Sequence, residues 1–426
     1  MLVNFRVENF KSLKNNTQFS MQATKLKNLT ESNTFLLNNV SLLKSAVIYG
    51  ANASGKSNVL SALENMKQVV KNSMNIETIK QYPLQTYLLN IESEKKDTTF
   101  EIEIIIGDII YRYGFSIYEK GVIQNEWLEQ KNMIPRAKWN NLFNREKQSI
   151  TLGNLFAEGK LLEDKTRDNA LFLSVVAQFN GEKSQSILQW FNNIKILSNI
   201  KNEEFEHYSF KMLEEESFKD RIVSFIKSAD TGISNIKMKK LKLDDLKLGK
   251  KELEQLPDFI LNELKEKGLS SIETLHIQYN DDNSFKAFKS FPLDFESTGT
   301  RKLLALSAYI IDTLDDGGIL IVDELDNSMH TDLVESIIKL FNSKVTNPNN
   351  AQLIFTTHDT NLLKQENFRR DQIWFTQKDI FGATELYSLV EYGKGKTRDD
   401  LVLEKNYLNG KFGGKPHISS LVYKSK

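Results

Sequence analysis

The sequence predicts an α/β fold with a parallel sheet, a mixed and antiparallel β-layer near the N-terminus, and an inserted helical region. The first observation behind this prediction is a short apolar run, residues 45–49, which ends at a glycine-rich turn and is followed by helical spacing. The second is the order helix, strand, helix, strand after residue 303, which is typical of a parallel α/β sheet. The third is a long polar stretch that separates these two parts.

Composition narrows the class of protein. The chain has 426 residues, which allows two or three domains or one large domain with an insertion. Its 56 Lys and Arg residues balance 56 Asp and Glu residues, so any contact with nucleic acid must be a local patch. Cysteine is absent, which excludes disulfides, thiolate metal sites and cysteine nucleophiles. No apolar run approaches the roughly 18–20 residues of a membrane span, and the start is unlike a signal peptide. We expect no membrane partner and a cytoplasmic location.

The first part of the chain, residues 1–180, is predicted to form an N-terminal lobe. Residues 1–10 alternate apolar and polar side chains with a period near two, which predicts an opening strand. Residues 58–71 carry apolar side chains at helical spacing, so a helix follows the glycine-rich turn. Two β-rich runs between residues 99 and 118 flank Gly107 and Asp108, which predicts a hairpin with its turn at that pair.

The middle of the chain, residues 181–284, is predicted to be a helical insertion. Its Lys, Glu, Leu and Ile content with scattered apolar positions suggests amphipathic helices. Residues 237–251 carry seven lysines and could contact DNA, but Asp244 and Asp245 interrupt the run, so a solvated helix face is the favoured interpretation. Residues 285–426 then form a C-terminal lobe.

A glycine-rich motif follows the first predicted buried strand. Residues 50–57 read GANASGKS and match G-x-x-x-x-G-K-[ST], in which backbone N–H groups wrap a phosphate and the lysine reaches its β and γ oxygens. The predicted helix behind it would direct the positive end of its dipole at the phosphates. A glycine-rich turn that contains a lysine by chance is the less favoured alternative. We expect nucleotide contacts from Gly50, Asn52, Ser54, Gly55, Lys56, Ser57 and Asn58, with Ser57 also a ligand of Mg²⁺.

Two adjacent carboxylates end the predicted strand at residues 319–322. Asp323 and Glu324 follow four apolar residues, at the strand end where α/β folds place their ligands. Asp323 would hold the Mg²⁺ shell, and Glu324 could deprotonate the attacking water. A buried strand that ends in a polar turn is the plain alternative, and the phosphate loop makes it the weaker one.

Two further positions remain open on the residues alone. His358 follows the next predicted strand and could reach a γ-phosphate, although a single histidine is more often structural. Ser297 precedes the predicted helix at residues 301–314 and looks like an N-cap with free N–H groups behind it, the geometry of an anion site. A mere cap is equally plausible there.

The spacing of the motifs argues against one class of motor. Lys56 and Asp323 lie 267 positions apart, far more than one βαβ unit needs, so a large segment is inserted between them. A ring-forming AAA+ motor is disfavoured, because its two Walker elements lie close together in sequence.

The motifs together carry a family resemblance. VENFKSL, GKSN, a late S-x-G-T, DELD with His330 after it, and a final TTHD resemble the ABC-type ATPase heads of the chromosome-maintenance, Rad-fifty and RecF families, over roughly residues 1–75 and 290–380. GTRKLLAL, VDELDNSMH, LIFTTHDTNLL, RRDQIWF, GATELYSL and YLNGKFGG resemble the abortive-infection and RloA-type ATPases of bacterial anti-phage defence, relatives of the ATPase subunit of the PARIS system, over nearly the whole chain.

This resemblance implies roles that the residues leave open. Ser297 and Gly299 match the ABC signature, which contacts the γ-phosphate held by the opposite subunit, so the chain would act as a homodimer or higher oligomer with ATP and Mg²⁺ between its heads. Residues 326–330 match the D-loop and His358 the switch histidine. The signature reads STGT, no clear Q-loop can be placed at Gln81 or Gln85, and the insertion lacks the heptads of a long coiled coil.

Three functions follow as hypotheses. The first is an ATPase that senses infection, through DNA or a phage component, and controls a separately encoded, nuclease-like toxic effector. The second is a RecF-like repair ATPase that binds DNA directly. The third is a scaffold that binds ATP but barely hydrolyses it, against which Lys56, Asp323 and Glu324 argue. Adjacent genes would separate the first from the second.

Overall fold

A computed structural model describes the chain except for residues 76–84, 119–120, 199–201, 242–268, 393–401 and 415–426. The chain divides into two compact units. The first contains residues 1–199, 313–326 and 334–426, and the second contains residues 200–312 and 327–333. Each unit is described by itself.

The centre of the first unit is a six-stranded sheet in the order β11-β15-β16-β5-β17-β18. Its first five strands are parallel and β18 is antiparallel to β17. β5 and β15 are continuous apolar runs with every residue buried, as expected for parallel strands covered on both faces. The strands are β5 (Ser45–Gly50), β11 (Ile194–Leu197), β15 (Ile319–Val322), β16 (Gln352–Thr356), β17 (Ile373–Lys378) and β18 (Thr384–Ser388).

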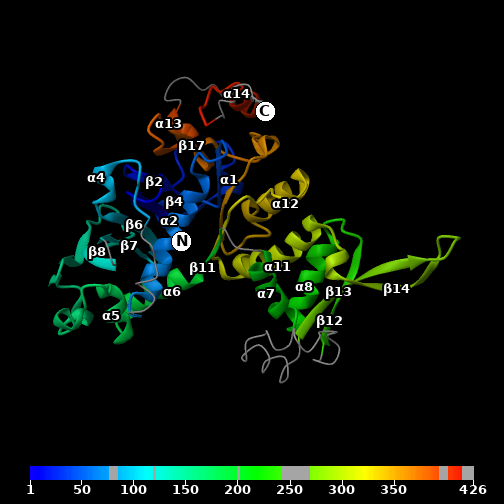
Figure 1. Cartoon of the computed structure of the whole chain (residues 1–426), viewed down its shortest axis with the longest axis horizontal. Coiled ribbons are helices and arrows are strands. Elements are labelled where there is room, and N and C mark those ends of the chain that lie inside the picture. The colour runs from blue at the N-terminus through cyan, green and yellow to red at the C-terminus, as the bar shows by residue number, and fades with distance from the viewer. Residues whose placement is uncertain (76–84, 119–120, 199–201, 242–268, 393–401, 415–426) are drawn as a thin grey trace, which may run out of the picture. The chain divides into compact units, whose positions relative to one another are not determined.

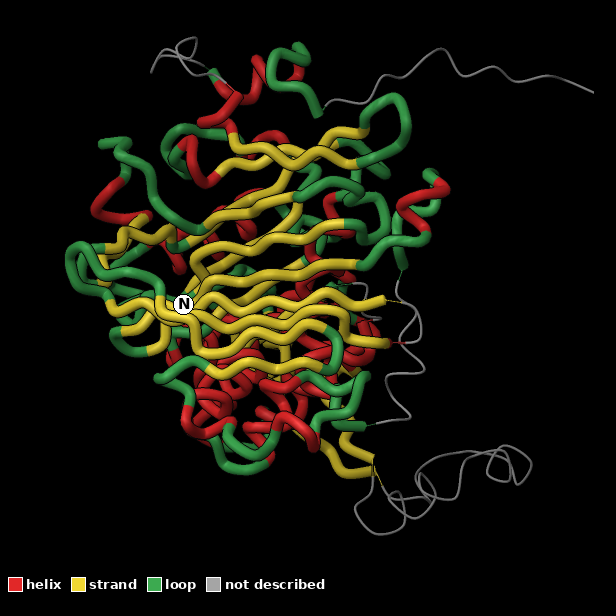
Figure 2. The backbone as a smooth tube through the Cα atoms, turned by 90° about the vertical axis from the view of Figure 1, so that its left-hand side faces the viewer, coloured by secondary structure: helices red, strands yellow, loops and turns green. Residues whose placement is uncertain are grey.

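The second layer of this unit is a seven-stranded antiparallel sheet in the order β10-β9-β8-β7-β6-β1-β2, whose long strands run side by side (Figure 2). β6 and β7 form the predicted hairpin, with Ile106 opposite Ile109 and only Gly107 and Asp108 between them. The strands are β1 (Leu2–Glu8), β2 (Thr17–Ser20), β6 (Thr98–Ile106), β7 (Ile109–Tyr118), β8 (Val122–Asn132), β9 (Asn140–Glu146) and β10 (Ser149–Leu152). A small pair, β3 (Thr34–Leu37) and β4 (Val40–Leu43), adds to them. The predicted α/β class with its antiparallel N-terminal layer is confirmed.

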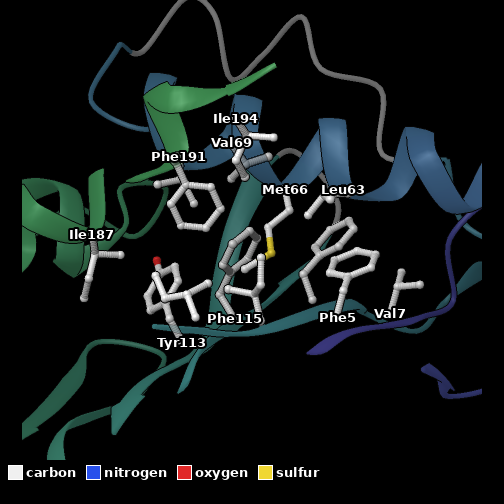
Figure 3. Packing of buried hydrophobic residues seen from close by; sticks show 14 of the residues in the cluster. Phe5, Val7, Leu63, Met66, Val69, Tyr113, Phe115, Ile187, Phe191 and Ile194 are labelled. Carbon is white, nitrogen blue, oxygen red and sulfur yellow. The ribbon is translucent and has the colours of Figure 1, made fainter. Parts of the chain in front are cut away.

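Helix α2 (Lys56–Asn72) packs between the layers. Its apolar side chains Leu63, Met66 and Val69 meet aromatic residues of the antiparallel sheet such as Phe5 and Phe115 (Figure 3). The other helices of the first unit are α1 (Thr30–Asn33), α4 (Ile91–Glu94), α5 (Phe172–Gln178), α6 (Glu182–Asn193), α13 (Leu389–Tyr392) and α14 (Leu403–Leu408), and α12 (Thr331–Asn342) crosses the boundary between the units. Short 3-10 turns lie at Ala157–Gly159, Glu163–Lys165, Thr360–Leu362 and Arg370–Gln372.

A buried ion pair fixes α5 against the antiparallel sheet. Arg145 and Glu126 have no exposed side-chain surface, and their charged groups lie 3.6 Å apart. Glu126 accepts hydrogen bonds from the N–H groups of Phe172 and Leu173 at the start of α5 and from the Tyr113 hydroxyl. Burial raises the pKa of Glu126, which Arg145 opposes. The carboxylate therefore joins two strands and one helix.

The second unit corrects part of the predicted helical insertion. Residues 181–227 contain α6, β11 and the helices α7 (Asn202–Met212) and α8 (Glu216–Lys227). Beyond them lie strands, β12 (Ile233–Leu241), β13 (Leu269–Tyr279) and β14 (Phe285–Pro292), in one antiparallel sheet that is followed by a 3-10 turn (Leu293–Phe295) and α11 (Thr298–Asp316). The lysine-rich composition suits an amphipathic helix and therefore predicts helices alone, whereas Ile236 and Met238 alternate with lysines at period two, as in a strand. The predicted lysine-rich helix face is likewise a strand up to residue 241, and the rest of that run lies outside the described residues.

Candidate functional site

Parallel pairing gathers the predicted site residues of the first unit at one sheet edge. Val322 lies opposite Phe355 and Thr356 opposite Ile48, so β15, β16 and β5 end at nearly the same level. The glycine-rich loop, the two carboxylates and His358 each follow one of these strand ends. Ligands of α/β proteins bind at this edge of the sheet.

The loop at residues 50–55 rests on two threonines of the neighbouring strands. The Ser54 hydroxyl lies 2.6 Å from the Thr376 hydroxyl, and the Ser54 carbonyl accepts a 2.8 Å hydrogen bond from Thr384. Gly55 has φ +110°, and a Cβ there would overlap Thr384. A Cβ on Gly50 would likewise overlap Thr376. The loop therefore needs glycine at both ends of its span.

Lys56 folds back over the loop. Its Nζ donates to the carbonyls of Gly50 at 2.9 Å and Ala51 at 3.2 Å. Burial lowers the pKa of Lys56, while the carboxylates of Asp323, Glu324 and Asp326 oppose that shift. In this position the ammonium can replace its hydrogen bonds to the loop carbonyls with contacts to an anionic ligand.

Helix α2 begins at Lys56 without a side-chain cap, because its N-cap is Gly55. Its first N–H groups and the positive end of its dipole are suited to a phosphate. Ser57 is half-buried and Asn52 is exposed. Asn58 instead contacts another part of the chain, since its amide donates to the Ser12 hydroxyl at 2.6 Å, which in turn lies 2.7 Å from Thr384.

Thr356 links the two carboxylate residues. Its hydroxyl donates to Asp323 Oδ1 at 2.5 Å and accepts a 2.7 Å hydrogen bond from the N–H of Glu324. Glu324 has φ +49°, a left-handed conformation that is uncommon for a residue with a side chain. The bend turns Glu324 away from the strand direction and leaves its carboxylate half-exposed.

His358 lies beside this pair. Its ring Nε2 is 4.0 Å from Glu324 Oε1, and its backbone N–H donates a hydrogen bond to Asp326 Oδ2 at 3.1 Å. Asp326 Oδ1 is buried and has no hydrogen-bond partner within the described part of the chain. The unpaired Asp326 Oδ1, the Lys56 ammonium and the carboxylates of Asp323 and Glu324 thus lie at one sheet edge. This set of groups fits a phosphate with a divalent cation.

The signature candidates lie in the second unit. The Ser297 hydroxyl accepts from the N–H of Thr300 at 3.1 Å, so Ser297 caps α11. A Cβ on Gly299 would overlap the carbonyl oxygen of Ser328. Lys302 Nζ also donates to the Asn327 carbonyl at 3.0 Å. The predicted signature and D-loop residues are therefore packed against each other.

Glu296, the residue before the Ser297 cap, is held by His276 and Thr274 of strand β13, a contact that we name the clasp. Its Oε1 lies 2.7 Å from His276 Nε2 and accepts a 2.5 Å hydrogen bond from the Thr274 hydroxyl. Sequence reasoning missed this clasp and the threonines at positions 356, 376 and 384. For Thr356 a signal existed, since it opens the TTHD motif. Gln81, one of the two Q-loop candidates, lies outside the described residues. The other candidate, Gln85, is exposed, and its backbone carbonyl accepts a hydrogen bond from the N–H of Lys11.

The sequence matches the family described as "AAA domain, putative AbiEii toxin, Type IV TA system" over residues 45–364, more than half of the chain. The chain belongs to this family. The matched range of this AAA family member begins at β5 and includes the phosphate loop, Ser297, both carboxylates and His358. The family match therefore assigns an AAA-type ATPase domain to residues 45–364.

Two solved structures are similar to this AAA family member. An SMC head bound to the C-winged helix domain of ScpA has 13% sequence identity and a TM-score of 0.44, and the match covers 91% of this chain and 97% of that one. The SMC head domain from Thermotoga maritima has 11% identity and a TM-score of 0.42, covering 91% and 98%. The comparison with curated proteins gives no match. Within the described residues, no helix has the length and apolar character needed to cross a bilayer.

Proposed function

We propose that this chain binds and hydrolyses ATP with Mg²⁺ at the edge formed by β5, β15 and β16. Lys56 and the uncapped N–H groups of α2 bind the phosphates, and Ser57 and Asp323 would hold Mg²⁺. The ion, when bound, neutralises charge on the phosphate oxygens. Glu324 accepts the proton of the attacking water, and His358 contacts the γ-phosphate.

The observation that carries the proposal is the convergence on Lys56. The carboxylates of Asp323, Glu324 and Asp326 all act on its ammonium, although they lie more than 260 positions later in the chain. A structural turn gives no reason to bury a lysine against its own loop carbonyls within the electrostatic reach of three carboxylates. A site built for Mg²⁺ and polyphosphate does.

We further propose that two heads close on two nucleotides. Ser297 and Gly299 would complete the site of a second copy, and the D-loop segment beside Gly299 would move with them. The cycle would sense infection and control a separately encoded, nuclease-like effector in anti-phage defence. The resemblance to abortive-infection ATPases and the family's toxin–antitoxin description support this role.

The first experiment measures ATP turnover and nucleotide affinity of the purified chain with Mg²⁺. Glu324→Gln should keep ATP bound and slow hydrolysis by about 10²-fold or more, because loss of a general base typically costs 10²–10⁴. Lys56→Ala should weaken ATP binding instead. Glu385→Gln, an exposed change on β18, is the matched control and should behave as wild type. Wild-type turnover in Glu324→Gln would show that another group activates the water.

The defence role needs a separate test. The chain alone and the chain with its neighbouring gene are expressed in bacteria, which are then challenged with phage. Protection that needs both genes, and that Glu324→Gln abolishes, is the expected result. ATP turnover that rises with DNA in the purified chain, without any effect of a neighbouring gene on plaque number, would favour the RecF-like repair function.

A further inference from the structure

The β13–β14 hairpin of the second unit carries an exposed apolar stripe. Ile277, Tyr279, Phe285 and Phe288 are 40%, 56%, 58% and 57% exposed. Ile277 lies opposite Phe288 and Tyr279 opposite Phe285, so all four side chains share one face, and the two phenylalanine rings touch at 5.4 Å. We name these four residues the hairpin stripe.

The stripe faces away from the body of its unit. The other face of the sheet carries Ile236 and Ile272, which are buried, and β12 packs against α8. In Figure 1 the hairpin extends beyond α7 and α8, and its outer residues are exposed along both strands. A two-stranded ribbon is marginally stable by itself, and grouped large apolar side chains on a surface mark an interaction site.

Charges of opposite sign lie at the two ends of the stripe. Lys237 and Lys239 of β12 are both exposed and lie opposite Glu273 and Ser271 in the register of the sheet. Their side chains therefore lie on the same face as the hairpin stripe, on the side toward β12. Asp281 and Asp282 occupy the turn at the other end. Glu273 is already engaged by the Ser290 hydroxyl at 2.6 Å and offsets part of the lysine charge. The side toward β12 therefore has an excess of lysine charge and the turn carries two aspartates, part of whose charge is offset by the exposed Lys286 of β14.

We propose that the hairpin stripe binds the same stripe of a second copy of this chain. A two-fold axis through the pair Ile277 and Phe288 places apolar residues against apolar residues. Ile277 lies four residues after Glu273, which is opposite Lys237, and four residues before Asp281. A two-fold axis at Ile277 therefore brings the lysines of one copy near the aspartates of the other. Such self-complementarity is the requirement for an isologous dimer interface.

This contact is independent of nucleotide. It involves neither the phosphate loop nor Ser297, and it would hold two chains together in the open state. ATP-driven closure would then be an encounter within one assembly, which raises the effective concentration of one head near the other. The proposed ATPase function can fail without affecting this inference, and the reverse also holds.

The oligomeric state without nucleotide tests the interface. Sedimentation of the full chain, and of Lys56→Ala, should show a dimer whose dissociation constant Phe288→Asp raises by about tenfold or more, as for a central interface residue. Val345→Asp, at a position that is 88% exposed in the first unit, is the control and should leave the dimer intact. A wild-type monomer, or a dimer that Phe288→Asp leaves unchanged, would overturn the proposal.

Two further experiments distinguish an interface between copies of the chain from a surface that binds nucleic acid. Because the chain has no cysteine, Phe288→Cys introduces a single thiol, and a short bis-maleimide should link two Phe288→Cys chains but not two Val345→Cys chains. Lys239→Glu should weaken the dimer, and adding Asp281→Lys should restore it. Equal linking of both cysteine variants would contradict the interface. A monomeric chain that binds a labelled single-stranded oligonucleotide, with Phe288→Asp abolishing binding, would make the stripe a base-stacking surface instead.

Discussion

The Thr356 hydroxyl holds Asp323 Oδ1 at 2.5 Å and the N–H of Glu324 at 2.7 Å, so one buried side chain from β16 positions both carboxylate residues that follow β15. We predict that Thr356→Val lowers kcat by about tenfold or more, since a lost buried hydrogen bond costs about 1–3 kcal/mol and 1.36 kcal/mol is a factor of ten. ATP affinity should change little, because Lys56 and α2 are untouched. Steady-state kinetics and nucleotide titration check this, and Thr356→Ser should restore turnover. An unchanged kcat in Thr356→Val would deny the hydroxyl a positioning role.

The signature candidates and the phosphate loop should complement each other between copies. Lys56→Ala and Ser297→Arg should each be inactive, while a heterodimer of the two retains one site, built from the loop of the Ser297→Arg chain and the signature of the other. ATP turnover of verified heterodimers is the measurement. If the mixture turns over no more ATP than either variant alone, the signature acts within its own chain or the two sites cannot act singly.

The clasp on Glu296 predicts an effect at a distance. His276→Ala removes one of the two side chains that hold Glu296 next to Ser297, so ATP-dependent turnover should fall by about threefold to tenfold while the affinity of the phosphate loop for ATP stays constant. His276→Gln keeps a donor and should lose less. Equal losses in the two variants, or a loss of ATP affinity, would point to a change in folding of the second unit.

The buried ion pair of Arg145 and Glu126 can be tested by a double-mutant cycle. Arg145→Met leaves the buried Glu126 carboxylate without its positively charged partner and should lower the free energy of unfolding by about 3–5 kcal/mol. Adding Glu126→Leu should recover part of that loss, although the N–H groups of Phe172 and Leu173 then lose their acceptor. Urea denaturation gives the four values. Additive losses would mean that the two charges do not stabilise each other.

Lys44 predicts a stabilising substitution with a defined pH dependence. Its side chain is buried, its ammonium has no hydrogen-bond partner among the described residues, and burial together with Lys344 lowers its pKa to about 8. Between pH 8 and 10.5 the unfolded chain binds a proton that the folded chain does not, so the stability of the wild type rises with pH across that window. Lys44→Met should therefore raise the free energy of unfolding by about 1–3 kcal/mol at pH 7 and by much less at pH 10. Urea unfolding at both pH values decides, and an equal gain at the two would exclude a role for the charge.

The phosphate loop and the carboxylate pair could be predicted from sequence because each is a local pattern with a defined spacing. Residues 50–57 and 319–324 carry their strand, turn and ligand residues within a few positions of one another. Parallel strands then bring the two patterns to one edge whatever lies between them. The structure places them together with His358 as these patterns implied.

The threonine supports could not be predicted in the same way. Thr376 and Thr384 reach the loop only because β17 lies next to β5 in the sheet, an order that no local pattern encodes. The strands β12 and β13 were missed for a different reason. Lysine-rich segments suit an exposed helix as well as an exposed strand, and only the alternation of Ile236 and Met238 with lysines distinguishes the two.

The strand order of the parallel sheet also governs how the protein is made. β5 is flanked by β16 and β17, which are synthesised more than 300 residues later. On the ribosome, the antiparallel hairpins can close early, whereas β5 stays without its neighbours until residues 352–378 have emerged. Contacts so distant in sequence slow folding and leave an apolar strand edge open to aggregation. A nascent chain halted before residue 350 would thus carry residues 50–57 and both carboxylates but neither strand that flanks β5, so the sheet edge beside Lys56 forms only after residues 352–378 have been made.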